Sequence, residues 1–381
     1  MRIGINAVNI RAGGGLNHLK EILLNLDPAM FNIEKVIIWS NKSTINHIPD
    51  LKWIKSIDVS KTINSWVGLL KWNFKILYNE LLTERCDVLF VPGGTYLGKF
   101  HPYVTMAQNL LPFDKIERKK YRYSKSYFRY VLLELTQKYT FKKADGVIFL
   151  TNYSHKKIIN ESIGPIGGVV KTIYHGVDES FFNTSRQQKD IFKKSNVPTK
   201  LLYVSIINYY KKQINVVKAF EILIKKGYDI ELELVGPAFS PALVELKNYI
   251  SKMNGLKNKI RYVGNVENKE LQKYYNNSDI FIFASSSETF GMILLEAMAS
   301  GLPIACSNVS SMPEILEQNG EYFDPNDPIS ISQAIEELLI NKKKRIYYSN
   351  SVIKRAKQFT WEKCSNKTFQ FVTTISKNTK G

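Results

Sequence analysis

The segment SSSETFGMILLEAMASGLP, residues 285–303, joins a strand to a helix through one glycine. The run before it, Asp279 to Ala284, is apolar and rich in residues that favour strands, which predicts a buried strand. Met292 to Ala299 holds strong helix formers with apolar residues at helical spacing, which predicts a helix. Gly291 lies at the junction, where the absence of a Cβ atom lets the backbone approach a ligand closely.

The start of this helix is a candidate anion site. The first N–H groups of a helix have no partner within it, and the helix dipole places partial positive charge at the same end. We therefore expect the backbone of Phe290, Gly291, Met292 and Ile293 to bind a diphosphate.

Two carboxylates, Glu288 and Glu296, stand eight positions apart around the glycine. Because phosphate repels a carboxylate, we expect each to accept hydrogen bonds from hydroxyl groups, one on a sugar and one on a ribose. A glycoside hydrolase would instead use them as a catalytic pair, about 5 Å or 6.5 to 9.5 Å apart across one bond. The placement of one in a loop and one in a helix beside a glycine favours the nucleotide.

This pattern resembles the Glu-x7-Glu element of retaining GT-B glycosyltransferases of family 4, the glycosyl transferases group 1. The resemblance continues through Pro303 to Ser307, an expected strand, and through Met312 to Ile315, an expected helix start. It implies that Glu288 contacts the donor hexose and is catalytic, and that Glu296 contacts the ribose. It covers nearly the whole chain, most clearly Leu201 to Glu314, and points to enzymes of bacterial polysaccharide or lipopolysaccharide synthesis.

Strands alternate with helices along the chain, which predicts an α/β protein with two Rossmann-like parallel-sheet domains. The resemblance implies the GT-B arrangement, with a cleft between the domains and a C-terminal helix that crosses back to the first. We expect an acceptor domain over 1–175, a donor domain over 176–355 and the returning helix over 356–381. The expected strands are Arg2 to Asn6, Val36 to Trp39, Val88 to Val91, Tyr103 to Met106, Val147 to Leu150, Val170 to Ile173, Leu201 to Ser205, Ile230 to Val235, Ile260 to Val263, Asp279 to Ala284 and Pro303 to Ser307.

The boundary between the two domains falls in Tyr174-His175-Gly176-Val177-Asp178, which is similar to the family's linker. We assign no chemistry to His175, because a lone histidine in a loop is usually structural. Trp361 stands where the family has a tryptophan in its last helix.

A second phosphate contact is expected in the loop after the first strand of the donor domain. The family has Gly-Arg-Leu there and a lysine six residues after the glycine, which corresponds to Lys211 and implies a catalytic role for it. The arginine position is Ile206, a departure that removes one cation. Either Lys212 substitutes for the arginine or the helix after Gly291 carries more of the phosphate charge.

The base of the nucleotide is expected on the loops after two later strands. Gly236 follows one apolar run, and Asn265 and Val266 follow the next, as in the family's base-binding loops. Because such recognition is largely through the backbone, UDP and GDP donors both stay open.

The first domain offers two further loops. Gly14 and Gly15 follow the first strand and open a helix, and such turns let N–H groups approach phosphate or sugar. Gln108 and Asn109 follow a later strand, where many relatives have a His-Asp-like pair, so an acceptor site here lacks a titratable base. No Gly-x-Gly-x-x-Gly sequence occurs, which disfavours nicotinamide and flavin chemistry.

A missing base is compatible with retaining transfer, in which the departing diphosphate oxygen takes the acceptor proton. We expect no cofactor and no metal, since no Asp-x-Asp motif is present. The expected reaction transfers a hexose from a UDP- or GDP-sugar to a lipid-linked oligosaccharide or lipopolysaccharide. The alternative is a catalytically silent GT-B subunit that binds a sugar nucleotide or a partner protein.

The net charge of +19 favours anionic partners. Lys115 to Lys143 is locally basic and interleaved with aromatic residues, and Trp66 to Leu82 mixes tryptophans, leucines and lysines, so either can form a helix that lies on an anionic membrane. Nucleic acid is disfavoured because no recognition motif accompanies the charge. The three cysteines lack metal-binding spacing, which suggests a reducing compartment, and no apolar run reaches the roughly 20 residues of a membrane span. We therefore expect a cytoplasmic protein. The two basic segments lead us to expect that it is peripheral on the inner face of the plasma membrane.

Overall fold

The computed structural model describes residues 1–381 except 12, 183–185, 192–196, 254 and 381. Two compact units make up the chain: the first unit is Met1–Gly176 with Thr360–Gly381, and the second unit is Val177–Phe359. The sequence predicts that the first domain ends at residue 175 and the second at residue 355, whereas the two observed segments end at Gly176 and Phe359. Ala12 of the Gly-rich loop, and parts of the polar stretch that leads to Thr199, lie outside the described residues.

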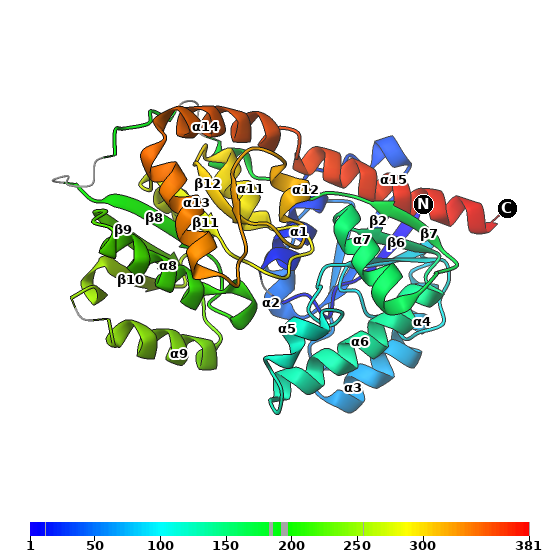
Figure 1. Cartoon of the computed structure of the whole chain (residues 1–381). Coiled ribbons are helices and arrows are strands. Elements are labelled where there is room, and N and C mark those ends of the chain that lie inside the picture. Colours follow the sequence, from blue (N-terminus) through cyan, green and yellow to red (C-terminus); the bar gives the residue numbers. More distant parts are fainter. Residues whose placement is uncertain (12, 183–185, 192–196, 254, 381) are drawn as a thin grey trace. The chain divides into compact units, whose positions relative to one another are not determined.

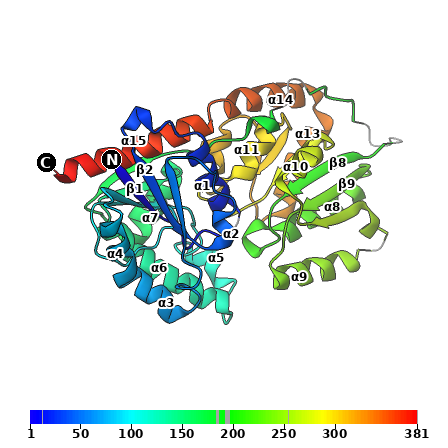
Figure 2. The same ribbon diagram turned by 180° about the vertical axis from the view of Figure 1, so that it is seen from behind.

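The sheet of the first unit has seven strands in the order β3-β2-β1-β4-β5-β6-β7, and the described pairs are parallel. Its inner strands are buried almost throughout because helices cover both faces (Figures 1 and 2). The strands are β1 (Arg2–Asn6), β2 (Lys35–Ser40), β3 (Ile54–Asp58), β4 (Val88–Val91), β5 (Tyr103–Ala107), β6 (Gly146–Phe149) and β7 (Val169–Thr172).

Helices of the first unit come from both ends of the chain. They are α1 (Gly14–Leu24), α2 (Lys42–Ile45), α3 (Trp66–Lys71), α4 (Leu77–Thr83), α5 (Lys115–Lys119), α6 (Lys125–Lys143), α7 (Asn152–Ile158) and α15 (Trp361–Lys380). The last of these, drawn in red in Figure 1, packs on α1 and on strands β4, β5 and β6. Ser365 Oγ donates to the carbonyl oxygen of Ile22 at 2.7 Å, which fastens α15 to α1.

The sheet of the second unit has six strands in the order β10-β9-β8-β11-β12-β13, again with parallel described pairs. Its strands are β8 (Thr199–Val204), β9 (Ile230–Val235), β10 (Ile260–Gly264), β11 (Ile280–Phe283), β12 (Ile304–Ser307) and β13 (Glu321–Phe323). Its helices are α8 (Gln213–Lys225), α9 (Ser240–Ser251), α10 (Asn268–Asn276), α11 (Met292–Ala299), α12 (Met312–Leu316), α13 (Pro328–Ile340) and α14 (Lys342–Ala356).

Two helical segments differ from the sequence interpretation. The Lys115 to Lys143 segment is two helices, and its Arg118 is not a solvated charge, because the guanidinium is buried in an ion pair with Glu134. The Trp66 to Leu82 segment is divided into α3, a π-helical turn over Trp72–Ile76, and α4. Trp72, which the sequence interpretation counted toward a membrane-facing helix, is instead buried in the core of the first unit.

Among the described residues, no helix combines the length and the hydropathy that crossing a bilayer would require.

Candidate functional site

The strand order of the second unit reverses between β8 and β11, which are neighbours in the sheet although β9 and β10 lie between them in the sequence. In open parallel sheets, ligands bind outside the carboxyl ends of the strands at such a switch point. The loop after β8 contains Lys211 and the loop after β11 contains Glu288. The topology therefore brings two of the expected site residues to one place.

Lys211 and Glu288 form an ion pair, with the lysine Nζ donating to Oε1 of the carboxylate. Their side chains are only 7% and 17% exposed, so the pair is shielded from water on most sides. The lysine Nζ also lies 5.1 Å from the ring centroid of Phe283 at the end of β11. A cation and an anion thus lie together at the end of the sheet. Each can bind a ligand group of opposite charge or a hydroxyl group.

Hydrogen bonds hold the two loops in place. Ser286 donates from both its backbone N–H and its Oγ to the carbonyl oxygen of Tyr210, at 2.8 and 2.9 Å. Ser310 Oγ accepts from the backbone N–H of Glu288 at 2.8 Å and lies 2.9 Å from its carbonyl oxygen, to which it donates. The serine contacts come from three separate loops, and sequence reasoning missed them because no local pattern marks them.

Gly291 is the N-cap of α11 and has φ 92° and ψ 59°, in the left-handed region. A Cβ atom at this position would meet its nearest neighbour, Met312 Sδ, at an ordinary 3.5 Å, so the backbone conformation and not space is what requires glycine. No side chain caps this helix start and no acidic residue stands in its first turn. The N–H groups of Met292 and Ile293 therefore present partial positive charge.

Phe290 precedes this helix and is buried, with its ring against Phe359 at a centroid distance of 5.9 Å. Its carbonyl oxygen accepts from Ser311 Oγ at 3.2 Å. Any contact of Phe290 with a ligand would accordingly come from its backbone.

Glu296 lies inside α11 and is nearly buried, at 8% exposure. Tyr275 Oη of α10 donates to its Oε2 at 2.8 Å. Burial raises the pKa of Glu296 to about 7, although the hydrogen bond from Tyr275 acts in the opposite direction, and the nearby Asp178 raises the pKa further. No local sequence pattern identifies Tyr275 as a partner of this carboxylate.

The loops expected to bind the base leave the same edge of the sheet as Lys211 and Glu288. Gly236 follows β9 with φ 137°, and a Cβ atom there would lie 2.3 Å from the carbonyl oxygen of Ser205, so only glycine fits. Asn265 is exposed and Val266 is half-buried after β10, with no ligand role shown by the geometry.

The position where the family has arginine is occupied by Ile206, and Lys212 is directed elsewhere. Lys212 is largely buried and its Nζ donates to Asn326 Oδ1 at 2.8 Å. Its backbone has φ 55° at the start of α8. In this arrangement Lys211, and not Lys212, carries the cation that pairs with Glu288.

The expected acceptor residues lie together within the first unit. Gly14 and Gly15 open α1, and a Cβ atom on Gly15 would lie 2.9 Å from Gln108 Oε1, which follows β5. Asn109 Oδ1 accepts from the backbone N–H of Leu111 at 3.1 Å, so this side chain shapes the loop. The structure thus brings Gly15 and Gln108 into proximity, and it leaves their role in binding as a prediction.

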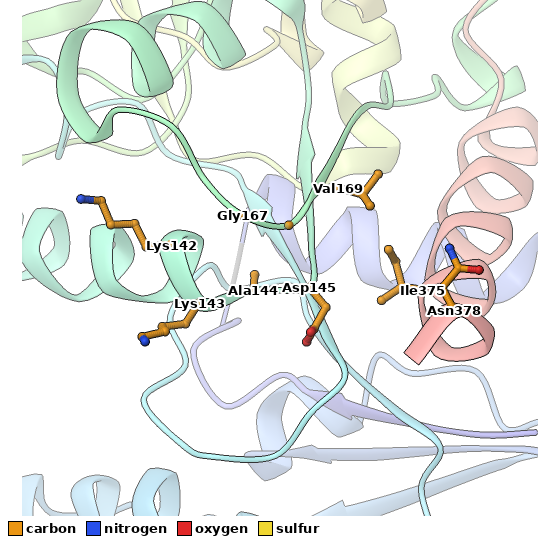
Figure 3. Close-up of a pocket in the computed structure, with 9 residues that line it drawn as sticks. Lys142, Lys143, Ala144, Asp145, Gly167, Val169, Ile375 and Asn378 are labelled. Atoms are coloured by element: carbon orange, nitrogen blue, oxygen red, sulfur yellow. The ribbon is translucent and has the colours of Figure 1, made fainter. Parts of the chain in front are cut away.

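A surface hollow of about 380 Å³ also occurs in the first unit. Figure 3 shows Lys142 and Lys143 on one side of it and Ile375 and Asn378 on the other. Asp145 and Gly168, which also line it, stand just before β6 and β7, at the amino ends of the strands. Ligands of parallel sheets bind at the opposite edge, so we assign this hollow no part in the site.

Comparison with known proteins gives the class of the second unit. Residues 183–356 match the family model described as Glycosyl transferases group 1. The O-antigen chain mannosyltransferase B of Escherichia coli is 39% identical over 109 residues, which is 29% of this chain and 29% of that protein. The chain matches the first curated relatives over 29% to 52% of their own length.

Solved structures resemble the chain over nearly its whole length. Sucrose-phosphate synthase from Thermosynechococcus elongatus has a TM-score of 0.76 at 16% identity, covering 97% of this chain and 98% of that one. The Anabaena protein HepE in complex with UDP-glucose has a TM-score of 0.69 at 17% identity, covering 98% and 100%. The structure of WaaG, a glycosyltransferase involved in lipopolysaccharide biosynthesis, has a TM-score of 0.71 at 13% identity, covering 97% and 99%. At such identities the likeness establishes the fold alone.

The fold is therefore that of GT-B glycosyltransferases, as the sequence predicted. Residues 183–356 of the second unit are thus similar to the glycosyl transferases group 1, a family of transferase enzymes.

Proposed function

We propose that the protein is a retaining glycosyltransferase of family 4. It transfers a hexose from a UDP- or GDP-sugar to a lipid-linked oligosaccharide or lipopolysaccharide acceptor. The relatives support this class of acceptor, since one is named as an O-antigen chain mannosyltransferase and one fold neighbour as an enzyme of lipopolysaccharide biosynthesis.

One observation carries the proposal: the ion pair of Lys211 and Glu288 at the switch point of the second unit, in the loops beside the uncapped start of α11. A diphosphate needs cations and N–H donors, and a sugar needs hydrogen-bond acceptors for its hydroxyl groups. This place offers both kinds of group. When a diphosphate arrives, Lys211 gains a second anionic partner, and Glu288 can accept from a hydroxyl of the hexose.

The transfer step requires little from a protein base. The bond between the anomeric carbon and the diphosphate oxygen breaks, and the acceptor oxygen forms its bond to that carbon on the same face of the sugar. The acceptor proton goes to the departing diphosphate oxygen. Lys211 and the N–H groups of Met292 and Ile293 would stabilise the negative charge on the leaving group, which is usually a large contribution to catalysis.

Gly14, Gly15, Gln108 and Asn109 of the first unit would then contact the acceptor. We propose that transfer needs neither a cofactor nor a divalent metal ion, because cations and helix N–H groups provide the charge at the diphosphate. Omitting Mg²⁺ and Mn²⁺ from the assay should leave the rate unchanged, and a rate that depends on either ion would contradict this part of the proposal.

A lipid-linked acceptor requires access to a membrane, and α6 has a suitable surface. Phe128, Leu132, Leu135 and Tyr139 are 48% to 68% exposed and follow one another at intervals of four, three and four residues, so they form one stripe along the helix. We call these four side chains the α6 stripe. Tyr130, Glu134, Gln137 and Phe141 of the same helix are buried on its other face.

Exposed basic residues flank the α6 stripe. They are Lys119, Arg122, Lys125, Arg129, Lys142 and Lys143. An apolar stripe between cations is the pattern of a helix that lies in the interface of an anionic bilayer. We propose that the protein is peripheral on the inner face of the plasma membrane and binds it through this helix.

The test is to incubate the protein with a panel of UDP- and GDP-sugars and to follow nucleotide release with and without a lipid extract that contains the acceptor. We expect one donor to be consumed and its hexose to appear on a lipid. The transferred hexose should have the same anomeric configuration as it had in the donor. Inversion of the configuration would contradict the retaining mechanism.

The second candidate function is a catalytically silent subunit. The specific observations in its favour are Ile206 at the usual arginine position and Gln108-Asn109 at the usual His-Asp-like pair. The silent subunit would be supported over the enzyme if calorimetry shows that a sugar nucleotide binds but no nucleotide is released in any lipid mixture from the source cell.

A further inference from the structure

Three side chains from distant parts of the sequence meet inside the first unit. His18 comes from α1, His175 follows β7, and Cys364 comes from the first turn of α15. Their ligand atoms, one ring nitrogen from each histidine and the cysteine sulfur, all lie within 4.8 Å of one another. All three are buried, with His18 at 0%, His175 at 4% and Cys364 at 2% exposure.

The polar atoms of this cluster are poorly satisfied by protein groups. Both ring nitrogens of His18 are buried and have no hydrogen-bond partner among the described residues, and the same holds for Trp361 Nε1. Leaving a buried polar group unpaired destabilises the fold, and His18 has two such nitrogens. A metal ion bound to one of them would give that nitrogen a partner.

The His18 ring is fully buried, and an imidazole nitrogen is among the commonest metal ligands in proteins. The Cys364 sulfur is buried beside the two rings, and it would bind zinc as the thiolate, which requires loss of the thiol proton. Trp361 stacks near both histidines, at ring distances of 6.0 and 5.7 Å, and helps to exclude water.

We propose that His18, His175 and Cys364 bind one zinc ion. Imidazole nitrogen and thiolate sulfur are both common zinc ligands, with ligand atoms about 2.0 to 2.3 Å from the ion and hence about 3.3 to 3.8 Å from one another. The separations of up to 4.8 Å would have to shorten when the ion binds. On binding, the Cys364 thiol gives its proton to solvent, and the sulfur forms its bond to the ion.

With three protein ligands, the fourth coordination position of the ion would be taken by water or another small ligand. The protein ligands join the start of the first unit, the end of its first chain segment and the helix that returns from the far end of the sequence. The site is separate from the proposed transfer chemistry, because Lys211 and Glu288 belong to the second unit. The inference therefore stands or fails independently of the proposed function.

The experiment uses the full chain, purified, treated with a chelator and then freed of it. Zinc is titrated in competition with a chromophoric chelator, and cobalt(II) is added to a parallel sample as a spectroscopic probe. We expect one equivalent of zinc to bind and the melting temperature to rise with it. Cobalt should give the intense near-ultraviolet band of a thiolate–cobalt bond together with the visible bands of a tetrahedral ion.

Two ligand variants and two matched controls locate the site. His18→Gln and Cys364→Ser should each weaken zinc binding about 100-fold or more, since second-shell changes alone cost 10- to 100-fold. Cys86→Ser, in the first unit, and Cys306→Ser, buried in the second, should bind as the unchanged protein does.

Circular dichroism shows whether each variant is folded. If the ligand variants do not fold, the cobalt spectrum of the unchanged chain still decides the matter, because a spectrum without the thiolate band overturns the proposal. The proposal is also overturned if less than one equivalent of zinc binds and the melting temperature does not rise, as expected of a cluster that holds only water. Zinc binding by folded His18→Gln and Cys364→Ser chains that equals the binding by the unchanged protein would overturn it too.

Discussion

At the scale of single residues, the pairing of Lys211 with Glu288 has a functional consequence. Neither charge is left alone in a largely buried place, so the free protein avoids the cost of an uncompensated charge. In the proposed reaction, a donor with both phosphate and hydroxyl groups would satisfy both partners at once. A nucleotide without its sugar would satisfy only the lysine.

The first prediction concerns Lys211. Lys211→Ala should lower kcat by about 100-fold or more, because removal of one group that stabilises a developing anion typically costs this much. Glu288→Gln should mainly lower kcat and leave nucleotide affinity nearly unchanged. The measurement is steady-state release of nucleotide from the identified donor.

A matched control for Lys211→Ala is Lys226→Ala, which removes the cation of the ion pair with Glu336 elsewhere in the second unit. Its kcat should equal that of the unchanged protein. Equal kcat values for all three variants and the unchanged protein would refute the assignment of Lys211 and Glu288.

The second prediction concerns the pH dependence of stability through Glu296. Its pKa is about 7 in the folded protein, against an ordinary value of 4.5, so the folded state holds the proton more tightly. The resulting stabilisation is complete below about pH 4.5 and is lost as the pH rises through 7. Glu296→Gln cannot ionise and should therefore gain stability relative to the unchanged protein between pH 5 and pH 8, by up to about 3 kcal/mol.

Urea unfolding of the two proteins at pH 5 and pH 8 measures this difference. Glu267→Gln, at an exposed position, serves as the control and should show no such gain. A difference between Glu296→Gln and the unchanged protein that is the same at both pH values would contradict the raised pKa. If Glu296 contacts the ribose, the same variant should bind the nucleotide more weakly.

At the scale of elements, the strands show what local sequence can predict. Every strand expected from the sequence is present, with ends within two residues, because long apolar runs mark strands that are buried on both faces. The two strands that were not expected, β3 and β13, are edge strands. Their sequences, IKSID and EYF, are polar or short, so neither forms an apolar run that would predict a strand.

The candidate site likewise combines features that local sequence predicts with contacts that depend on the fold. Gly291 and the start of α11 could be predicted, because a strand, a glycine and a helix follow one another directly in the sequence. The contacts of Glu288 with Lys211, and of Glu296 with Tyr275, join residues 77 and 21 positions apart and depend on the order of strands in the sheet. The convergence of His18, His175 and Cys364 is more distant still, so no spacing rule could reveal it.

Helix α6 provides the third prediction. Phe128→Ser combined with Leu132→Ser and Leu135→Ser should reduce binding to anionic liposomes more than about tenfold, because burial of these side chains in the bilayer interface is lost. Removing the flanking cations at Arg122, Lys125 and Arg129 should reduce binding too, and more so at low salt than at high salt. Liposome flotation at two salt concentrations measures both effects.

Val244→Ser is the control, since Val244 is an exposed apolar residue, 58% accessible, on α9 of the second unit. It should float with liposomes as the unchanged protein does. If the triple serine variant also floats normally, the α6 stripe does not bind membranes.

At the scale of the whole molecule, the return of α15 to the first unit makes that unit depend on the last residues of the chain. Phe369 is fully buried, and Phe371 and Ile375 lie against Gly146, where a Cβ atom would be 2.9 Å from the Phe371 ring. The helix thus covers part of the sheet that the first 176 residues cannot cover themselves.

The fourth prediction follows from this packing. Phe369→Ala should destabilise the first unit by about 3 to 5 kcal/mol, the usual cost of a buried phenylalanine, and should lower the temperature of one calorimetric transition. Lys367→Ala, at an exposed position of the same helix, is the control and should leave the transition in place. Calorimetric traces that coincide for the two variants would contradict the role of α15.

The split of the first unit between the two ends of the chain also orders its biogenesis. Residues 177–359 leave the ribosome before Trp361 does. The second unit can therefore fold while the first unit still lacks helix α15. Stalled nascent chains in which Phe359 is followed by a flexible linker long enough to fill the ribosomal exit tunnel should therefore resist proteases in the second unit and be cut in the first. For this protein, the part that is translated earliest is the part that matures last.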